Sequence, residues 1–197
     1  MYEYRKMTPE ERRAIVAARK ARGYPLHSPP HFKGIPGVYL ITAACYEHRR
    51  IFDTPTLLSM LTDEVLAAFS RAGLVCQAWI FLPNHYHMLL ELEDITCISE
   101  PLRKAHSRTA TKANGMQETP GRRVWYRYSD RMIRNERHYW ASVNYIHYNP
   151  IKHGYVELMS GWPWSSVHAF EDSLGIDVLE SLWKAYSIID YGKGWDD

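Results

Sequence analysis

The chain has 197 residues, of which 46% are hydrophobic, and its formal net charge is +2 at pH 7. This length predicts one main domain with short additions, large enough to bury a core. The sequence has no apolar run of about 18 residues that would cross a membrane and no apolar stretch of a secretory signal near its start, so we expect a cytoplasmic protein without membrane contact.

The N-terminal region predicts a helix followed by a linker. Residues 8–22 begin with "TPEE", which supplies a cap, a proline in the first turn and two acids, and continue as a short basic segment. The following "GYPLHSPPHFKGIPG" is too rich in proline and glycine for regular structure. Residues 1–35 are therefore expected to form a basic helix and a linker ahead of the main domain.

The main domain is expected to open with a strand and a helix, and then a pair of strands. "VYLITAACY" is rich in strand-forming residues, and "PTLLSMLTDEVLAAFSRAG" has apolar residues at helical spacing and ends at Gly73. "LVCQAWIFLP" and "HYHMLLEL" read as two strands, with Pro83 and Asn84 forming the turn between them.

The second half predicts a basic helix over residues 98–113, a strand in "RVWYRYSDRMI", and a helix over residues 135–148 that is closed by Pro150 and Gly154. The order strand, helix, strand, strand, helix, strand, helix is that of a ferredoxin-like fold. We therefore expect an α+β domain over residues 36–170, with an antiparallel sheet and helices packed on one face. Residues 171–197 form an acidic C-terminal tail.

The cysteines and the distribution of charge limit the classes of function that fit this chain. Cys45, Cys76 and Cys97 are widely spaced and odd in number, which argues against both a disulfide framework and a zinc ribbon. Residues 101–140 hold ten Arg or Lys against three acids, whereas from Glu157 onward two lysines face eight acids. Aromatic residues lie within the basic region, a composition typical of nucleic-acid binding. The alternative is a solvated helix face with aromatics packed beneath it.

Two histidines, His85 and His87, lie at the start of a predicted strand. Side chains alternate along a strand, so both imidazoles point to the same side and Tyr86 to the other. They either hold a metal ion or pack beside a hydrogen-bonded position of the core.

Tyr145 and Asn149 are the partners that the histidines would need. They are four residues apart on the last predicted helix, so their side chains share one face. A divalent ion held by His85, His87 and Asn149 would polarise a phosphodiester and orient it for attack by the phenol of Tyr145. Because the chain has 14 tyrosines, the alternative interpretation of Tyr145 is a packed helical residue.

The combined motifs resemble a known family. "LPNHYHMLL", "YIHYNPIKHGYV" and "WPWSSVHAF" occur in the order seen in the REP-associated tyrosine transposases, a branch of the single-tyrosine HUH transposases, and the resemblance covers roughly residues 36–170. It implies a metal-dependent endonuclease and strand transferase that acts on single-stranded or hairpin DNA and joins a tyrosine to a 5′ phosphate. It also implies His85, His87 and Asn149 as ligands of Mg²⁺ or Mn²⁺, and Tyr145 as the nucleophile.

Two tyrosines compete with Tyr145. The middle residue of the histidine triplet is Tyr86, where the family more often has an aliphatic residue, and it becomes a rival nucleophile unless it faces the other side of the sheet. Tyr148 lies on the same helix as Tyr145 but about 60° away from the face shared with Asn149. Geometry therefore favours Tyr145.

Basic residues and one aromatic residue are our candidates for DNA contacts, through phosphate binding and base stacking. They are Arg103, Lys104, Arg108, Lys112, Arg122, Arg123, Trp125, Arg127 and Lys152. Each of them has the alternative of an ordinary surface charge or a buried aromatic.

Two other functions stay open. The first is a hairpin-binding protein without cleavage activity. The second is a metal-dependent hydrolase in which His85, His87 and Glu91, which share strand parity, activate water. As the strand and the tyrosine helix are both present in one chain, we expect a monomer, with a dimer that exchanges this helix as the alternative.

Overall fold

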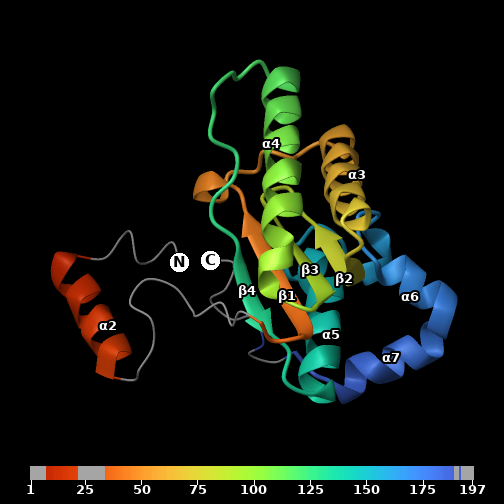
Figure 1. The fold of residues 1–197 in the computed structure, drawn as a ribbon. Coiled ribbons are helices and arrows are strands. Elements are labelled where there is room, and N and C mark those ends of the chain that lie inside the picture. The colour runs from red at the N-terminus through yellow and green to blue at the C-terminus, as the bar shows by residue number, and fades with distance from the viewer. Residues whose placement is uncertain (1–7, 22–33, 189–190, 192–197) are drawn as a thin grey trace.

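The computed structural model describes residues 8–21, 34–188 and 191. Its centre is an antiparallel sheet of four strands in the order β2-β3-β1-β4 (Figure 1). The strands are β1 (Gly37–Ala44), β2 (Val75–Phe81), β3 (His85–Leu92) and β4 (Ser129–Met132). This order and the alternation of strands with helices confirm the predicted α+β, ferredoxin-like architecture.

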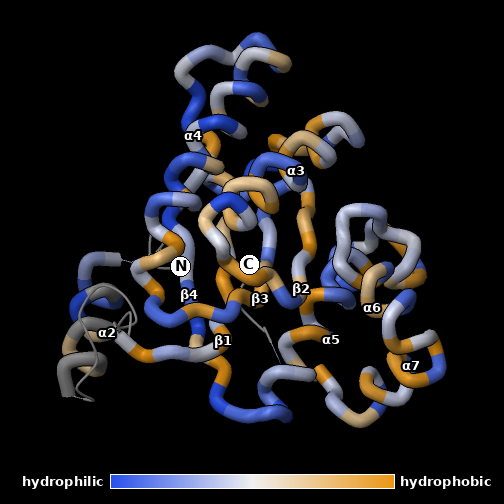
Figure 2. Tube along the Cα trace, turned by 45° about the vertical axis from the view of Figure 1, so that its right-hand side comes forward, coloured by the Kyte–Doolittle hydropathy of each residue, from blue (hydrophilic) through white to orange (hydrophobic). Residues whose placement is uncertain are grey.

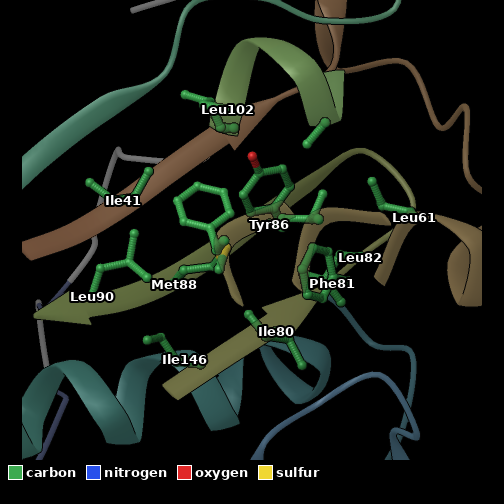
Figure 3. Packing of buried hydrophobic residues seen from close by; sticks show 14 of the residues in the cluster. Ile41, Leu61, Ile80, Phe81, Leu82, Tyr86, Met88, Leu90, Leu102 and Ile146 are labelled. Atoms are coloured by element: carbon green, nitrogen blue, oxygen red, sulfur yellow. The ribbon is translucent and has the colours of Figure 1, made fainter. Parts of the chain in front are cut away.

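Helices cover both faces of the sheet. Helices α3 (Pro55–Arg71) and α4 (Ser99–Met116) pack on one face, and α5 (Glu136–Lys152) packs on the other. Figure 3 shows Leu102 of α4 above the strands and Ile146 of α5 below them. The expected placement of helices on one face therefore holds for α3 and α4 but not for α5. Strand β3 is buried on both faces over most of its length, which requires a cover on each side.

The two strands of the central hairpin are joined as the sequence predicts. Pro83 and Asn84 form the turn between β2 and β3, and the backbone N–H of Leu82 donates to the carbonyl of His85 at 2.9 Å. This turn fixes the register in which β3 pairs with its neighbours, so it also fixes which face each histidine occupies.

Helix starts follow local capping chemistry. In α2 (Pro9–Ala21) the Thr8 hydroxyl accepts from the backbone N–H of Glu11 at 3.3 Å, and the Glu11 carboxylate accepts from the Thr8 N–H at 2.7 Å. In α3 the Thr54 hydroxyl accepts from the N–H of Leu57. The linker expected after α2 lies mainly in residues 22–33, outside the described residues.

The strand expected over residues 123–133 is shorter than predicted. Only β4 belongs to the ladder, and Trp125 forms a single bridge with Cys45. Thr42 on β1 and Cys45 just after it are three positions apart, whereas their partners Ser129 and Trp125 are four positions apart. The extra residue prevents continuous pairing, as in a β-bulge.

Two helices are longer than predicted. Helix α5 continues through Pro150 to Lys152, so the proline lies inside the helix instead of closing it. Pro150 has no N–H to donate to the carbonyl of Ile146, and the end of the helix is held instead by the N–H of His153, which donates to the carbonyl of Asn149 at 3.1 Å. Helix α4 extends to Met116, three residues beyond its expected end.

The C-terminal part of the described chain is also helical. Helices α6 (Val167–Leu174) and α7 (Ile176–Ala185) follow α5, and α6 crosses the expected start of the acidic tail at residue 171. Short 3₁₀ helices occur at Tyr46–His48, Ile95–Ile98 and Met159–Gly161. In the described part of the chain, every helix is too short or too polar to cross a membrane.

Candidate active site at the β3–α5 face

Strand β3 brings the two histidines together on the face covered by α5. The His85 and His87 rings are 5.0 Å apart, with their planes at 76°. Only 1% of His85 and none of His87 is exposed. Both side chains therefore lie inside the layer between the sheet and α5.

The Nδ1 atom of each imidazole contacts a neighbouring polar side chain. Nδ1 of His85 lies 2.8 Å from Oδ1 of Asn84, and Nδ1 of His87 lies 2.7 Å from Oγ1 of Thr42 on β1. Because an amide oxygen only accepts, the tautomer with its proton on Nδ1 would donate to Asn84 and would direct the lone pair of Nε2 towards α5. Such outer hydrogen bonds are typical of histidines that bind metals through the other nitrogen.

Helix α5 supplies the other two predicted groups. Oδ1 of Asn149 lies 3.2 Å from Nε2 of His85, and the hydroxyl of Tyr145 lies 3.4 Å from Nε2 of His87. The ring of Tyr145 also packs against His87, with centroids 5.1 Å apart. The structure thus brings together all four residues that the sequence placed at one site, from two elements of a single chain.

The donor set fits a divalent ion. Oδ1 of Asn149 faces the lone pair of His85, and Nδ2 of Asn149 is buried without a hydrogen-bond partner. Two facing acceptors repel each other unless a cation lies near both. Bonds of about 2.1 Å at right angles would separate two ligands by about 3 Å, close to the distance seen. Among the described residues, the acids, cysteines and histidines form no metal-binding group of three, so a third protein ligand would be a residue of another type, such as Asn149.

Comparisons with known proteins find similar sequences and a similar structure. No protein-family model matches the chain. A REP-associated tyrosine transposase of Escherichia coli K12 is 33% identical over 113 residues, which are 57% of this chain and 66% of that protein. A putative REP-associated tyrosine transposase of Haemophilus influenzae Rd is 28% identical over 127 residues, which are 56% of this chain and 72% of that protein.

A solved structure extends the likeness to the fold. The structure of a REP-associated tyrosine transposase bound to a REP hairpin matches with a TM-score of 0.58 and 28% identity, over 73% of this chain and 82% of that one. The chain is therefore similar to REP-associated tyrosine transposases both in sequence and in fold. The match spans just under two thirds of the length of the E. coli relative.

Tyr145 has charged and aromatic neighbours. Nζ of Lys152 lies 5.4 Å from the centre of the Tyr145 ring. The ring of Tyr191, from the far end of the chain, lies 5.4 Å from the same ring, and its hydroxyl contacts Oγ of Ser142 on α5. The cation of Lys152 therefore lies close to the group predicted to attack the phosphate.

The competing tyrosines lie elsewhere. Tyr86 is fully buried on the opposite face of the sheet, where its hydroxyl lies 2.7 Å from Nε2 of His106 on α4, and burial raises its pKa well above 10. The expectation that Tyr86 faces away from the histidines is confirmed. Tyr148 is half-buried on α5, and within the described structure it has no hydrogen bond or ring contact with His85 or His87.

The carboxylate considered for a hydrolase is distant from the histidines. Glu91 lies four residues beyond His87 on β3, about 13 Å along the strand. Its side chain is exposed and accepts from Nε2 of Gln77 at 3.0 Å. This placement disfavours a water-activating role for Glu91 at the histidine pair.

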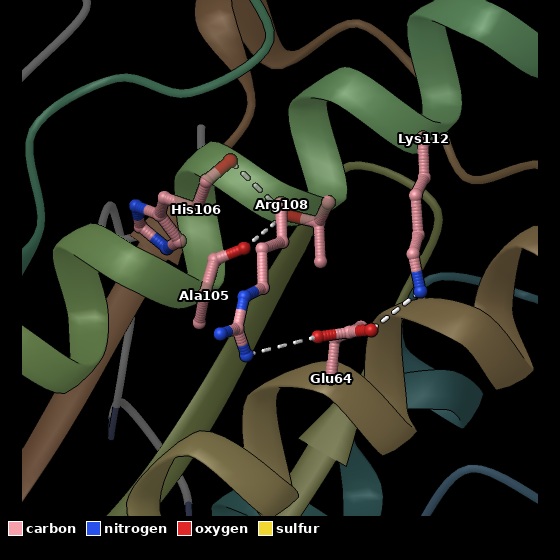
Figure 4. Close-up of polar contacts among 6 residues, drawn as sticks. Glu64, Ala105, His106, Arg108 and Lys112 are labelled. Atoms are coloured by element: carbon pink, nitrogen blue, oxygen red, sulfur yellow. Dashed lines mark hydrogen bonds and ion pairs between the residues drawn. The ribbon is translucent and has the colours of Figure 1, made fainter.

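Helix α4 covers the face of the sheet opposite the histidines, and its basic side chains form ion pairs with acids. Arg103 and Lys104 pair with Glu100 at 2.9 Å and 3.2 Å. Lys112 and Arg108 pair with Glu64 of α3 at 2.5 Å and 3.8 Å, as Figure 4 shows. Figure 2 shows many hydrophilic residues along α4. Phosphate binding by these four residues stays a prediction.

The candidates between α4 and β4 divide into packed and exposed residues. Arg122 donates to Oδ1 of Asn114 at 3.0 Å and to Oε1 of Gln117 at 2.5 Å, which ties the loop to α4. Trp125 stacks on His106 at 4.2 Å and on Phe52 at 5.3 Å. These contacts favour packing as the role of Trp125. Arg123, Arg127 and Lys152 are exposed.

Sequence reasoning missed the residues behind the histidines. Asn84 was assigned only to the turn, and Thr42 only to a strand. The signal for Asn84 was its place directly before His85, whereas Thr42 becomes visible only when β1 is paired with β3 in the correct register. Tyr191 lies in the tail, for which the resemblance gave no expectation.

Proposed function

We propose that this protein is a metal-dependent endonuclease and strand transferase for single-stranded or hairpin DNA, acting through a covalent 5′-phosphotyrosine at Tyr145. The proposal depends on one observation. Two residues that are one turn apart on α5 lie next to two alternate residues of β3. Tyr145 and Asn149 face Nε2 of His87 and of His85 at 3.4 Å and 3.2 Å. The hairpin bound to the related solved structure supports the choice of substrate.

His85, His87 and Asn149 would hold Mg²⁺ or Mn²⁺. When bound, such an ion withdraws electron density from the phosphate and orients it. Asn84 and Thr42 hold the two imidazoles in a fixed orientation through their Nδ1 atoms. The burial of both histidines beneath α5 reduces the access of water.

In the reaction, the Tyr145 oxygen forms a bond to phosphorus while the bond from phosphorus to the 3′ oxygen of the preceding nucleotide breaks. The phenol loses its proton, and the leaving oxygen becomes a 3′ hydroxyl. Lys152 offsets negative charge that develops beside the ring of Tyr145. The ester bond is conserved in the phosphotyrosine, so a second 3′ hydroxyl can attack it and join two DNA ends without ATP.

The second candidate function is a hairpin-binding protein without cleavage activity. Both candidates predict DNA binding that weakens with salt, because phosphate contacts release counterions. Only the first requires the phenol to lie beside the histidine pair, and the contact between Tyr145 and His87 favours it. We also infer that the site works in a monomer, since a single chain contributes all four groups.

The test is incubation of the protein with a labelled hairpin oligonucleotide that has single-stranded flanks, with Mg²⁺ or Mn²⁺, followed by a denaturing gel. The wild type is expected to form a covalent complex. Tyr145→Phe should lose the complex and keep its affinity for DNA, while the matched control Tyr148→Phe should retain both. A wild type that binds the hairpin but yields no covalent complex with either ion would assign the protein to the binding class.

A further inference from the structure

An arginine and two tyrosines form a cluster beyond the end of β1. The guanidinium of Arg123 lies 4.4 Å from the ring centre of Tyr46 and 5.7 Å from that of Tyr126. The two rings are 6.3 Å apart, with their planes at 47°. Arg123 is exposed, and both tyrosines are half-buried. We refer to these three residues as the Arg123 cluster.

The cluster lies beside the histidine pair on the same side of the sheet. Ala44, the last residue of β1, is paired with His85, so their side chains share a face. Cys45 is extended, which returns Tyr46 to the face of Ala44, about 7 Å further along the chain. The N–H of Tyr126 donates to the carbonyl of Ala44 at 3.0 Å.

The orientation of Tyr126 follows from its neighbour. Trp125 packs into the opposite layer, against Phe52 and His106. The next side chain of an extended segment points the other way, which places Tyr126 on the histidine side. Both rings therefore border the surface that leads to His85.

Arg123 is the arginine best suited to receive a phosphate here. Within the described structure it forms no ion pair, and its one hydrogen bond runs from Nε to the carbonyl of Trp125 at 3.4 Å. A guanidinium that contacts rings through its flat face keeps N–H groups at its edge for a phosphate. By contrast, Arg103 is paired with Glu100, and Arg122 is bonded to Asn114 and Gln117.

A second cation and aromatic pair is connected to His85 through the ring of His153. The ring of His153, which follows α5, is 5.1 Å from that of His85 and 6.2 Å from that of Tyr155. The guanidinium of Arg50 lies 5.3 Å from the centre of the Tyr155 ring. The candidate active site therefore has two groups in which an arginine lies against aromatic rings.

We propose that the Arg123 cluster binds the unpaired flank of the DNA, with Arg123 on a backbone phosphate and the tyrosine rings against bases, and leads this strand to the histidine pair. This inference rests on the proposed function, and it names the part of the DNA that is bound. Aromatic rings stack on bases that are not confined within a duplex, so the cluster suits a single strand rather than the hairpin stem.

The test measures equilibrium binding by fluorescence anisotropy in EDTA, with the full chain and two labelled oligonucleotides. One is a hairpin with single-stranded flanks at both ends, and the other is the same hairpin with blunt ends. The variants are Arg123→Gln and Tyr46→Leu, and the matched control is Arg71→Gln, at an exposed arginine in the last turn of α3. Thermal unfolding of each variant verifies the fold.

Arg123→Gln and Tyr46→Leu should weaken binding of the flanked hairpin by about fivefold to a hundredfold, the range expected for the loss of a stacked base. Binding of the blunt hairpin should be unchanged, and Arg71→Gln should resemble the wild type on both. If Tyr46→Leu fails to fold, the binding measured for Arg123→Gln tests the inference by itself.

Three results would overturn the inference, and they separate it from the proposed function. If the wild type forms the covalent complex but both variants bind the flanked hairpin like wild type, only the inference fails. Equal losses on the flanked and blunt hairpins would assign the cluster to the stem. If the wild type binds neither oligonucleotide, the proposed function fails together with the inference.

Discussion

The hydroxyl of Tyr145 lies 3.4 Å from Nε2 of His87, although the two residues are 58 positions apart in the chain. This contact joins α5 to β3 and makes the phenol part of the same group as the imidazoles. Because the phenol belongs to α5 and the imidazoles to β3, a shift of the helix would separate the phenol from its neighbours. The predictions below examine the groups that hold this arrangement in place.

The first prediction concerns the amide of Asn149. Asn149→Ala should weaken Mn²⁺ binding at least tenfold, because it removes the oxygen that faces Nε2 of His85. Asn149→Asp should retain Mn²⁺ binding, because it keeps an oxygen and adds negative charge. Titration calorimetry with Mn²⁺ in the absence of DNA measures both, and equal affinity for Asn149→Ala and the wild type would remove Asn149 from the ligand set.

A second prediction concerns the support behind His87. Thr42→Val keeps the side-chain shape but removes the hydroxyl that lies 2.7 Å from Nδ1 of His87. We expect Mn²⁺ affinity to fall about 10-fold to 100-fold, as for other outer hydrogen bonds of metal-bound histidines. Thr42→Ser restores the hydroxyl and should return the affinity to near the wild-type value. Failure of the serine variant to recover would show that side-chain packing, and not the hydrogen bond, matters at this position.

The third prediction uses the pH dependence of Glu64. Its hydrogen bond to Lys112 is the main reason that the pKa of this carboxyl is lowered, with a smaller contribution from Arg108. A carboxyl whose pKa is lower in the folded state contributes stability above its ordinary pKa of 4.5, and this stability is lost as the pH falls through the folded value.

Glu64→Gln should therefore lower the free energy of unfolding at pH 7 by less than about 1 kcal/mol, because both cations that face Glu64 are about half exposed. The difference from the wild type should shrink below pH 4 and in high salt. Urea unfolding at pH 7 and at pH 3 measures it. A deficit that persists unchanged at pH 3 would mean that shape, and not charge, explains the effect.

The fourth prediction separates packing from stacking at Trp125. Trp125→Leu removes a ring that contacts Phe52 and His106 and an indole N–H that donates to Thr109 at 2.9 Å. We expect the free energy of unfolding to fall by about 2 to 4 kcal/mol, as for the truncation of other packed aromatic residues. The affinity of the folded variant for the flanked hairpin should equal that of the wild type. A loss of affinity with little change in stability would instead make Trp125 a stacking platform for DNA.

Most of the fold could be predicted because its signals are local. The capped start of α3, its apolar spacing and the glycine that follows it define the helix, and Gly73 has the positive φ of 72° that ends it. The Pro83–Asn84 turn defines the hairpin. The missed features depend on tertiary contacts: the extra residue between Trp125 and Ser129, and the packing of α5 on the second face of the sheet.

The candidate site could be predicted only in part. Strand parity places His85 and His87 together, and helical spacing places Tyr145 beside Asn149, without knowledge of the rest of the chain. The meeting of these pairs depends on which face α5 covers, which local patterns do not encode. For the same reason the sequence could not show that His87 is fully buried, so His87→Ala is expected to cost stability as well as metal binding.

The most direct test of the central claim is to identify the residue that carries the DNA. The wild type is incubated with Mn²⁺ and a flanked hairpin, the DNA is trimmed with nuclease, and the protein is digested and analysed by mass spectrometry. The account predicts a nucleotide linked through phosphate to Tyr145, with unmodified Tyr86 and Tyr148. A nucleotide on Tyr86, Tyr148 or any other residue, or a cleaved hairpin without a modified peptide, would contradict it.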